Sequence, residues 1–233
     1  MTRPRNIVVL TGAGVSAESG VPTFRGPDGL WEGHRVEDVA TPQAFRRDPA
    51  LVQAFYDARR AALAKVEPNA AHLALARLDA EWPGEFLLVT QNVDDLHERA
   101  GSQRLLHMHG ELKRALCRAC GAAPAWEGAL SGSPLCPSCG EARLRPDIVW
   151  FGEMPYQMER IEAALEICDV FVSIGTSGAV YPAAGFVDLA RRAGAQCLEL
   201  NLDPSAGTPL FHAARRGPAG RLVPAWVDEM LTD

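Results

Sequence analysis

The chain has few lysines and no long apolar run. Lys65 and Lys113 are its only lysines, an imbalance that fits codon bias in a GC-rich genome and indicates no function. The formal net charge is -6, so the protein as a whole is not built to bind nucleic acid through its phosphates. No apolar segment has signal-peptide design or the roughly 18 residues needed to span a membrane. We therefore expect a cytoplasmic monomer with no membrane partner and no direct nucleic-acid partner.

Short apolar runs alternate with helical patterns along the chain. This alternation predicts an α/β fold in which a Rossmann-like parallel sheet has helices on both faces. A hydrophobic fraction of 47% in 233 residues is enough for one sizeable core with a small appendage. Asp48 and Asn69 are the expected N-caps of two helices. The predicted strands are 6–10, 86–90, 105–108, 148–151, 170–175 and 196–200, and the predicted helices are 48–65, 69–81, 158–167 and 183–193.

A glycine turn follows the first predicted strand. Gly12, Gly14 and Ala17 form the pattern G-x-G-x-x-A before a helical segment. Glycines let a backbone approach a pyrophosphate closely, and a helix N-terminus offers free N–H groups to the anion. A tight turn with no ligand is the alternative. An ordinary Rossmann dehydrogenase would have a second strand ending in an acidic residue within about 30 residues, whereas residues 18–26 form a loop rich in Gly and Pro.

Four of the six cysteines form two C-x-x-C pairs. Cys117 and Cys120 make the first pair, and Cys136 and Cys139 follow after a gap of fifteen residues. This spacing is typical of a tetrahedral thiolate site for Zn²⁺, and disulfides are not expected in a reducing compartment. Four thiolates leave no open coordination position, so the sequence predicts one structural zinc ion. The metal would replace the hydrophobic core that this short insert lacks.

The chain resembles the sirtuin family in five motifs that keep the family's order and spacing. They are GAGVSAESGVPTFRG (12–26), TQNVDDLHERAG (90–101), HMHGEL (107–112), GTSGAVYPAAG (175–185) and ELNL (199–202). The match runs from about residue 5 to 230, and it is most similar to class III bacterial enzymes that remove succinyl and acetyl groups. The resemblance implies that NAD is a consumed co-substrate. Nicotinamide leaves the ribose, the acyl oxygen attacks the anomeric carbon, and the acyl group ends on ADP-ribose.

The resemblance also implies the roles of individual residues. Asn92 and Asp94 would position nicotinamide and a water network, and His109 would be the general base that takes a proton from a ribose hydroxyl. His107 and His109 are expected to share one face of a strand, and only the family's H-G-x-L pattern selects His109. His97 is expected to cap or pack on the following helix. The implied NAD contacts are Gly12, Ala13, Gly14, Ala17, Glu18, Thr23, Phe24, Arg25, Trp31, Gln91, Asn92, Val93, Asp94, His109, Gly175, Thr176, Ser177, Asn201, Leu202, Asp203 and Ala219.

Tyr56 and Arg59 lie three residues apart on a predicted helix, so they share a face. A guanidinium can clamp a carboxylate through two N–H groups, and a phenol can donate a third hydrogen bond. Spacing alone favours an ordinary amphipathic helix with Arg59 in water. The resemblance to the class III Y-x-x-R pair instead implies recognition of acidic acyl groups. Ala40 would leave room for a long acyl chain, and the substrate peptide would add as a strand beside Val149, Phe151, Gly152 and Glu153.

Together these features predict an NAD-dependent protein-lysine deacylase. It would remove succinyl, malonyl and acetyl groups from acylated-lysine proteins or peptides and release nicotinamide and O-acyl-ADP-ribose. We expect residues 1–35, 68–113 and 145–233 to form the Rossmann-like NAD-binding domain, 36–67 a helical module, and 114–144 the zinc-binding insert.

Three other functions are compatible with parts of the sequence. An ADP-ribosyltransferase would share the NAD site and the release of nicotinamide. A non-enzymatic NAD-binding adaptor would not need the set Gln91, Asn92, Asp94 and His109, because binding alone requires no base. A hydride-transfer dehydrogenase is disfavoured by the missing acidic residue after an early second strand.

Overall fold

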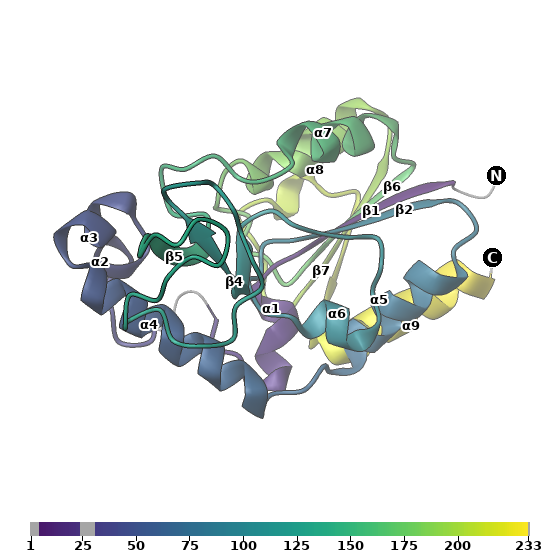
Figure 1. Cartoon of the computed structure of the whole chain (residues 1–233). Helices are drawn as coiled ribbons and strands as arrows, with labels where there is room; N and C mark the ends of the chain where they lie inside the picture. The colour runs from purple at the N-terminus through teal and green to yellow at the C-terminus, as the bar shows by residue number, and fades with distance from the viewer. Residues whose placement is uncertain (1–4, 24–30, 233) are drawn as a thin grey trace.

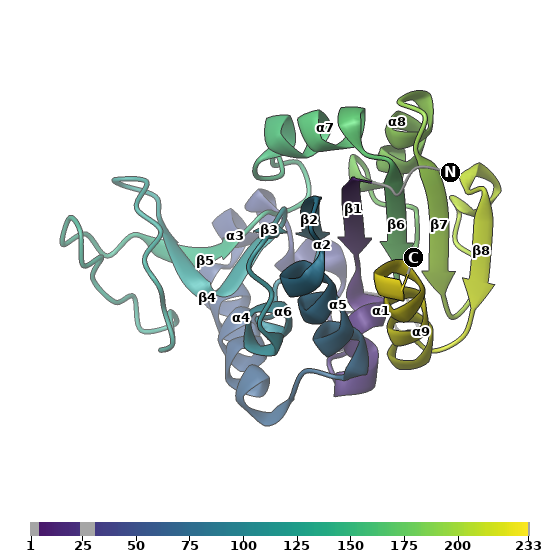
Figure 2. The same cartoon turned by 90° about the vertical axis from the view of Figure 1, so that its right-hand side faces the viewer.

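Six parallel strands form the central sheet of the protein. The computed structural model describes residues 5–23 and 31–232. Within these residues the strand order is β3-β2-β1-β6-β7-β8, and every neighbouring pair is parallel (Figures 1 and 2). The predicted α/β class with a Rossmann-like sheet is therefore confirmed. The strands are β1 (Asn6–Thr11), β2 (Glu85–Thr90), β3 (Leu105–His107), β6 (Val170–Ile174), β7 (Gln196–Asn201) and β8 (Ala213–Arg216).

Helices cover both faces of this sheet. Helices α5 (Ala70–Glu81) and α9 (Ala219–Thr232) pack on one face. Helices α7 (Met158–Ile167) and α8 (Phe186–Arg192) pack on the other, so the two pairs lie below and above the sheet in Figure 1. Since the central strands are buried on both faces, they are continuous apolar runs and do not alternate with polar residues. Further short helical segments are α1 (Ala13–Ser16), α6 (Leu96–Ala100), and the 3₁₀ turns Ala17–Ser19, Leu63–Lys65, Ala183–Gly185 and Thr208–Leu210.

The two predicted N-caps are confirmed. The carboxylate of Asp48 accepts the backbone N–H of Leu51 at 2.9 Å, at the start of α4 (Pro49–Ala62). The side chain of Asn69 caps α5, and its own backbone N–H donates to Nδ1 of His72 at 3.2 Å, which completes a capping box. These local bonds fix where the chain enters each helix.

A second unit lies beside the sheet. It contains α4, two short helices and an antiparallel pair of strands whose connection carries the cysteines (Figure 2). Asp57 on α4 accepts the backbone N–H groups of Leu130 and Ser131 at 2.9 Å. Helix α4 thereby anchors the cysteine-bearing segment. The other elements are α2 (Val36–Val39), α3 (Pro42–Arg47), β4 (Gly110–Cys117) and β5 (Leu144–Ile148).

The predicted strand at 148–151 is wrong. Strand β5 ends at Ile148 and pairs antiparallel with β4, outside the parallel sheet. The apolar character of the next residues has another cause, because Trp150 is only 3% exposed and packs in the core of the second unit. Backbone N–H groups of Val149 and Phe151 donate to His109 and Ala40, and these bonds tie the segment to both units.

Several elements had no counterpart in the sequence prediction. Strand β8 is a four-residue edge strand that carries two arginines, and α9 contains Pro224. Strand β8 lacks the apolar run that predicts a strand, because an edge strand does not need one. Helix α9 was missed because proline normally interrupts a helix. No helix in the two described ranges combines the length and apolarity needed to cross a membrane.

Candidate active site

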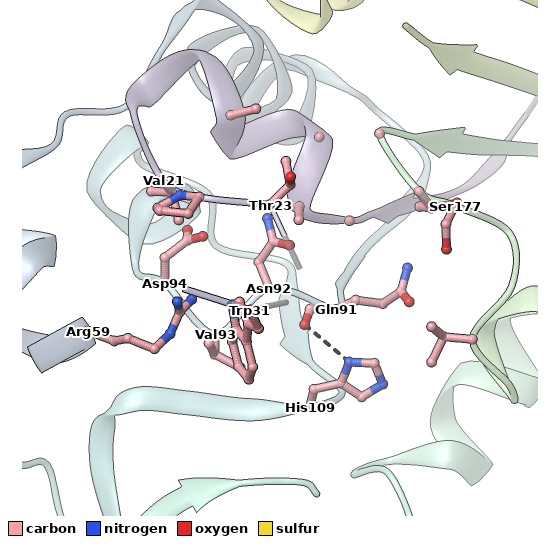
Figure 3. Close-up of a pocket in the computed structure, with 18 of the residues that line it drawn as sticks. Val21, Thr23, Trp31, Arg59, Gln91, Asn92, Val93, Asp94, His109 and Ser177 are labelled. Atoms are coloured by element: carbon pink, nitrogen blue, oxygen red, sulfur yellow. Dashed lines mark hydrogen bonds between the residues drawn. The ribbon is translucent and has the colours of Figure 1, made fainter. Parts of the chain in front are cut away.

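A pocket of about 660 Å³ opens at the carboxyl ends of β1 and β6. The sheet continues through β2 on one side of this point and through β7 on the other, so the direction of strand order reverses here. Ligands of open α/β sheets bind at such switch points. The pocket extends from the glycine turn to α4 and to the segment that follows β5 (Figure 3).

The predicted ligand-contact residues converge on this pocket. Every residue predicted to contact NAD or the acylated lysine lines it, apart from two. These two, Phe24 and Arg25, lie outside the described residues. The pocket therefore joins segments that are far apart in sequence, from residue 12 to residue 219. Figure 3 draws 18 of its residues and labels ten of them, among them Thr23, Gln91 and Ser177.

Three glycines form the innermost wall. The N–H of Gly14 donates to the carbonyl of Gly175 at 2.9 Å, so the turns after β1 and β6 touch through their backbones. A Cβ atom on Gly12 would lie 2.8 Å from that carbonyl, and one on Gly14 would lie 2.7 Å from the Cα of Gly175. Gly175 itself has a φ of +62°. The crossing requires glycine, and it leaves bare backbone that a pyrophosphate can approach.

Asn92 and Asp94 are buried at the floor of the pocket. The amide of Asn92 donates to Oγ of Ser16 at 3.1 Å, and Asp94 accepts the backbone N–H of Leu96 at 3.2 Å. Burial raises the pKa of Asp94, although the N–H of Leu96 and the hydroxyl of Ser16 oppose the shift. Ser16 was missing from the predicted contacts. Its position inside the glycine motif is the signal that could have found it.

Two neutral histidines support this floor from behind. Nδ1 of His72 accepts a backbone N–H, so its proton lies on Nε2, which donates to Ser16 at 3.3 Å. Nε2 of His97 bonds to the hydroxyl of Thr11 at 3.1 Å, and the two rings lie 4.8 Å apart. Burial lowers the pKa of His72 to about 4 and that of His97 well below its ordinary value. The prediction had His97 cap or pack on the helix after Asp94, whereas it lies within α6 and its buried ring contacts Thr11 and His72.

His109 is the histidine that faces the pocket. Its Nδ1 lies 3.2 Å from the carbonyl of Gln91, marked by the dashed line in Figure 3. A carbonyl can only accept, so this nitrogen carries the proton and Nε2 keeps a free lone pair. Burial lowers the pKa of His109, and the bond to Gln91 only partly opposes it. The imidazole is therefore neutral at pH 7 and able to accept a proton.

His107 points elsewhere, and the expectation that both histidines share a face is wrong. Its Nδ1 donates to the carbonyl of Asn92 at 3.0 Å, and its Nε2 lies 2.6 Å from Glu98, in a second cavity. Burial lowers the pKa of His107, but Glu98, the Asn92 carbonyl and Glu111 together raise it above the ordinary value. Side chains alternate only within a continuous strand, whereas β3 ends at His107 and β4 begins at Gly110.

Tyr56 and Arg59 lie at the α4 end of the pocket. Tyr56 is fully buried and accepts a hydrogen bond from Nε1 of Trp150 at 3.1 Å, which leaves its own O–H free to donate. Burial raises the pKa of Tyr56 far above its ordinary value, so the phenol stays protonated. Trp150 lies within the predicted substrate segment, but its bond to Tyr56 was not predicted. No pattern distinguishes it from its apolar neighbours.

Arg59 is a buried cation with few partners. The side chain is 7% exposed, and the guanidinium carbon lies 4.2 Å above the ring of Trp31. Figure 3 shows Arg59 reaching from α4 toward Trp31 and Asp94. Within the described part of the chain, its Nε has no hydrogen-bond partner, and Nη1 makes only an ion pair with Glu32 at 3.3 Å. Donors of this kind can receive a carboxylate.

The four cysteines meet at the far side of the second unit. Cys117 and Cys139 lie 3.7 Å apart through their sulfurs, Cys120 and Cys136 lie 3.8 Å apart, and all four sulfurs fall within 4.8 Å of one another. A tetrahedron with Zn–S bonds of about 2.3 Å has edges of about 3.8 Å. The donor set fits a closed, structural Zn²⁺ site. None of these cysteines lines the pocket.

Fold and site together define a nucleotide-binding type of α/β protein that carries a zinc-type thiolate cluster. Comparison with known sequences gives the family. A family model described as Sir2 family matches residues 12–182. The NAD-dependent protein deacylase of Salmonella typhimurium strain LT2 is 54% identical over 99% of this chain and 85% of that protein. The enzyme of the same name from Vibrio parahaemolyticus is 56% identical over 97% of this chain and 95% of that protein.

Solved structures agree with this assignment. A Sir2 homologue in complex with NAD has a TM-score of 0.90 and 42% identity, covering 98% of this chain and 90% of that chain. A Sir2 protein with a deacetylated p53 peptide and 3′-O-acetyl-ADP-ribose has a TM-score of 0.83 and 28% identity, covering 97% and 94%. The chain belongs to the Sir2 family, the sirtuins. The resemblance drawn from its five motifs is confirmed.

Loss of the zinc ligands should destabilise the insert, because its own apolar cluster is small. We expect the protein to contain about one Zn²⁺ per chain, and we expect Cys136→Ser to lose the metal and unfold at a lower temperature. Elemental analysis and thermal unfolding measure both effects. Cys168→Ala, which alters a buried cysteine outside the cluster, should keep the metal. A stable and active metal-free protein would contradict a structural zinc.

Acid should destabilise the fold through His72. The unfolded imidazole has an ordinary pKa of 6.5, and the folded one a pKa of about 4, so below pH 6.5 the unfolded state binds more protons and stability falls. At pH 5 the loss is about 2 kcal/mol. Urea unfolding at pH 7.5 and pH 5 should therefore show a smaller loss for His72→Gln than for the parent. His212→Gln, at an exposed histidine, should lose as much unfolding free energy between the two pH values as the parent does. An equal loss in His72→Gln would refute the role of His72.

Proposed function

We propose that the protein is an NAD-dependent protein-lysine deacylase that removes succinyl, malonyl and acetyl groups and releases nicotinamide and O-acyl-ADP-ribose. One observation carries the proposal. A single pocket has a bare glycine wall, a neutral imidazole with a free Nε2, and a buried guanidinium with unused donors. Its relatives named NAD-dependent protein deacylases support the reaction class.

The glycine wall and the pocket floor fit the parts of NAD. The backbone at Gly12, Gly14 and Gly175 would hold the pyrophosphate, since no side chain blocks its approach. Asn92 and Asp94 would orient the nicotinamide, and the bonds of Asn92 to Ser16 and of Asp94 to the Leu96 N–H keep both side chains in fixed positions. When bound, NAD supplies the ribose carbon that accepts the acyl group.

His109 would act as the general base at the same ribose. Its Nδ1–H is anchored to the Gln91 carbonyl, so the ring presents Nε2 to the pocket in one tautomer. The lowered pKa keeps Nε2 unprotonated at neutral pH, and burial excludes competing water from much of the ring. Nε2 would take a proton from a ribose hydroxyl, as an imidazole near neutral pH does well.

Tyr56 and Arg59 would select acidic acyl groups. A succinyl or malonyl carboxylate at this end of the pocket would meet unused guanidinium donors and a phenol O–H. Ala40, which lines the pocket near them, would leave space for the longer acyl chain. The pocket would also admit an acetyl group, because a shorter acyl chain needs less space.

The segment from Val149 to Glu153 would hold the substrate peptide. Glu153 accepts the backbone N–H of Trp150 at 2.9 Å and pairs with Arg145 at 2.9 Å, which stiffens the turn. Phe151 is 43% exposed at the rim and offers an apolar surface to the lysine stem. Backbone recognition of this kind reads little flanking sequence, so broad protein substrates are expected.

His109→Ala should abolish turnover while NAD binding is largely kept, because the imidazole moves a proton and does not form the glycine wall. Deacylation of an acetyl-lysine peptide and binding of NAD by calorimetry measure the two properties. Normal turnover would remove His109 from its role. With labelled NAD, label on free O-acyl-ADP-ribose supports deacylation, whereas label on protein supports an ADP-ribosyltransferase.

Arg59→Met should impair desuccinylation far more than deacetylation, because a carboxylate would lose its charged donors. We expect kcat/KM on a succinyl-lysine peptide to fall by about 100-fold and that on the matching acetyl-lysine peptide to change by less than about threefold. Arg46→Met, at an exposed arginine of α3, is the matched control. Equal losses on both peptides would refute the carboxylate clamp.

A further inference from the structure

Glu32 sits at the tip of a tight turn at the mouth of the pocket. Trp31 and His34 exchange backbone hydrogen bonds of 2.8 and 3.1 Å, which leaves a two-residue loop of Glu32 and Gly33. Both loop residues have positive φ, +48° and +79°, the geometry of a type I′ turn. A glutamate is an unusual choice for such a position, where Asn, Asp or Gly costs less. The turn nevertheless brings its side chain to the pocket wall.

The carboxylate of Glu32 is paired with Arg59, but weakly. Oε1 lies 3.3 Å from Nη1, the geometry does not meet that of a hydrogen bond, and the Glu32 side chain remains 33% exposed. Among the described residues, no other carboxylate lies within salt-bridge distance of Arg59. Asp94 acts on the guanidinium from farther away, and Tyr56 is protonated. The pair is therefore loose enough to exchange.

The two classes of acyl group make opposite demands on this pair. An acetyl group brings no charge, so a buried guanidinium beside it would remain uncompensated, which is costly. A succinyl or malonyl group brings its own carboxylate, and a second carboxylate on the same guanidinium would then repel it. One residue with a loosely held, partly exposed carboxylate meets both demands, since it can stay with Arg59 or turn to water.

We propose that Glu32 is an exchangeable counter-carboxylate that sets the balance between neutral and acidic acyl groups. It neutralises Arg59 while the acyl chain is uncharged, and it gives way to the acyl carboxylate when there is one. This inference rests on the proposed function of the Tyr56–Arg59 pair. It adds a specificity-determining residue that contacts the clamp and not the reacting atoms.

The test compares KM for acetyl- and succinyl-lysine versions of one peptide. Glu32→Gln removes the charge and keeps the size, so KM for the succinyl peptide should fall by about threefold and KM for the acetyl peptide should rise by about threefold, while kcat changes little for either. Glu32→Asp should restore part of the parental ratio. Glu85→Gln, at an exposed residue at the amino end of β2, should leave both values unchanged.

A second variant separates the charge from the turn. Glu32→Gly also removes the carboxylate, but glycine adopts positive φ without strain, so the turn should be kept or stabilised. It should shift the two KM values in the same opposite directions as Glu32→Gln. Parallel shifts on both peptides, or no shift in either variant, would overturn the role of Glu32.

The Arg59→Met background distinguishes failure of this inference from failure of the proposed function. If Glu32 acts through Arg59, Glu32→Gln should have no effect on the KM ratio once Arg59 is methionine. A selective loss of desuccinylation in Arg59→Met, combined with no effect of Glu32→Gln in the parent, would overturn only the role of Glu32. Equal losses on both peptides in Arg59→Met would overturn the clamp itself.

Discussion

The backbone contact between Gly14 and Gly175 is the constraint on which the arrangement of the site depends. It brings the turn after β1 against the turn after β6, at the point where the order of strands reverses. Any Cβ atom at either position would collide with backbone, which cannot move aside as a flexible side chain can. The same contact that closes the core therefore leaves an exposed strip of main chain. Fold and binding surface arise there from one steric requirement.

The opposite wall of the pocket depends on helix α4, where the neighbouring residues Arg59 and Arg60 point in different directions and make different contacts. Arg60 turns toward the cysteine-bearing segment and donates to the carbonyl of Leu112 at 2.6 Å, beside an ion pair with Asp57. Arg59 turns into the pocket and leaves donors unused. Because Arg60 fastens the helix to β4 and Asp57 fastens it to the connection between β4 and β5, the direction of Arg59 is fixed by contacts outside the pocket. The thiolate cluster acts indirectly, because it holds the cysteine-bearing segment to which Asp57 of α4 is hydrogen-bonded.

Sequence patterns predicted what depends on local chemistry. The β-branched runs, the caps at Asp48 and Asn69, the glycine turn and the two cysteine pairs each follow from interactions within a few residues, and the structure agrees with them. The failures depend on distant contacts. The segment after Ile148 is apolar because Trp150 packs against residues of α4. The periodicity of the sequence does not reveal this contact. The separation of His107 from His109 required a chain turn that alternation within a strand does not foresee.

Charge distribution links the remaining features of the pocket. Its imidazole is neutral, its phenol is protonated, and Asp94 has a pKa raised by burial, while Arg59 is the only arginine or lysine among the described residues that line it. A buried guanidinium cannot release its proton at any ordinary pH, so the protein must supply an anion, admit one, or accept the cost of an unpaired charge. Trp31 offsets part of that cost through its ring face, and Glu32 offsets another part from a position open to water. Under the proposed function, a pocket built around a permanent cation would favour acyl groups that carry an anion and would still admit neutral ones.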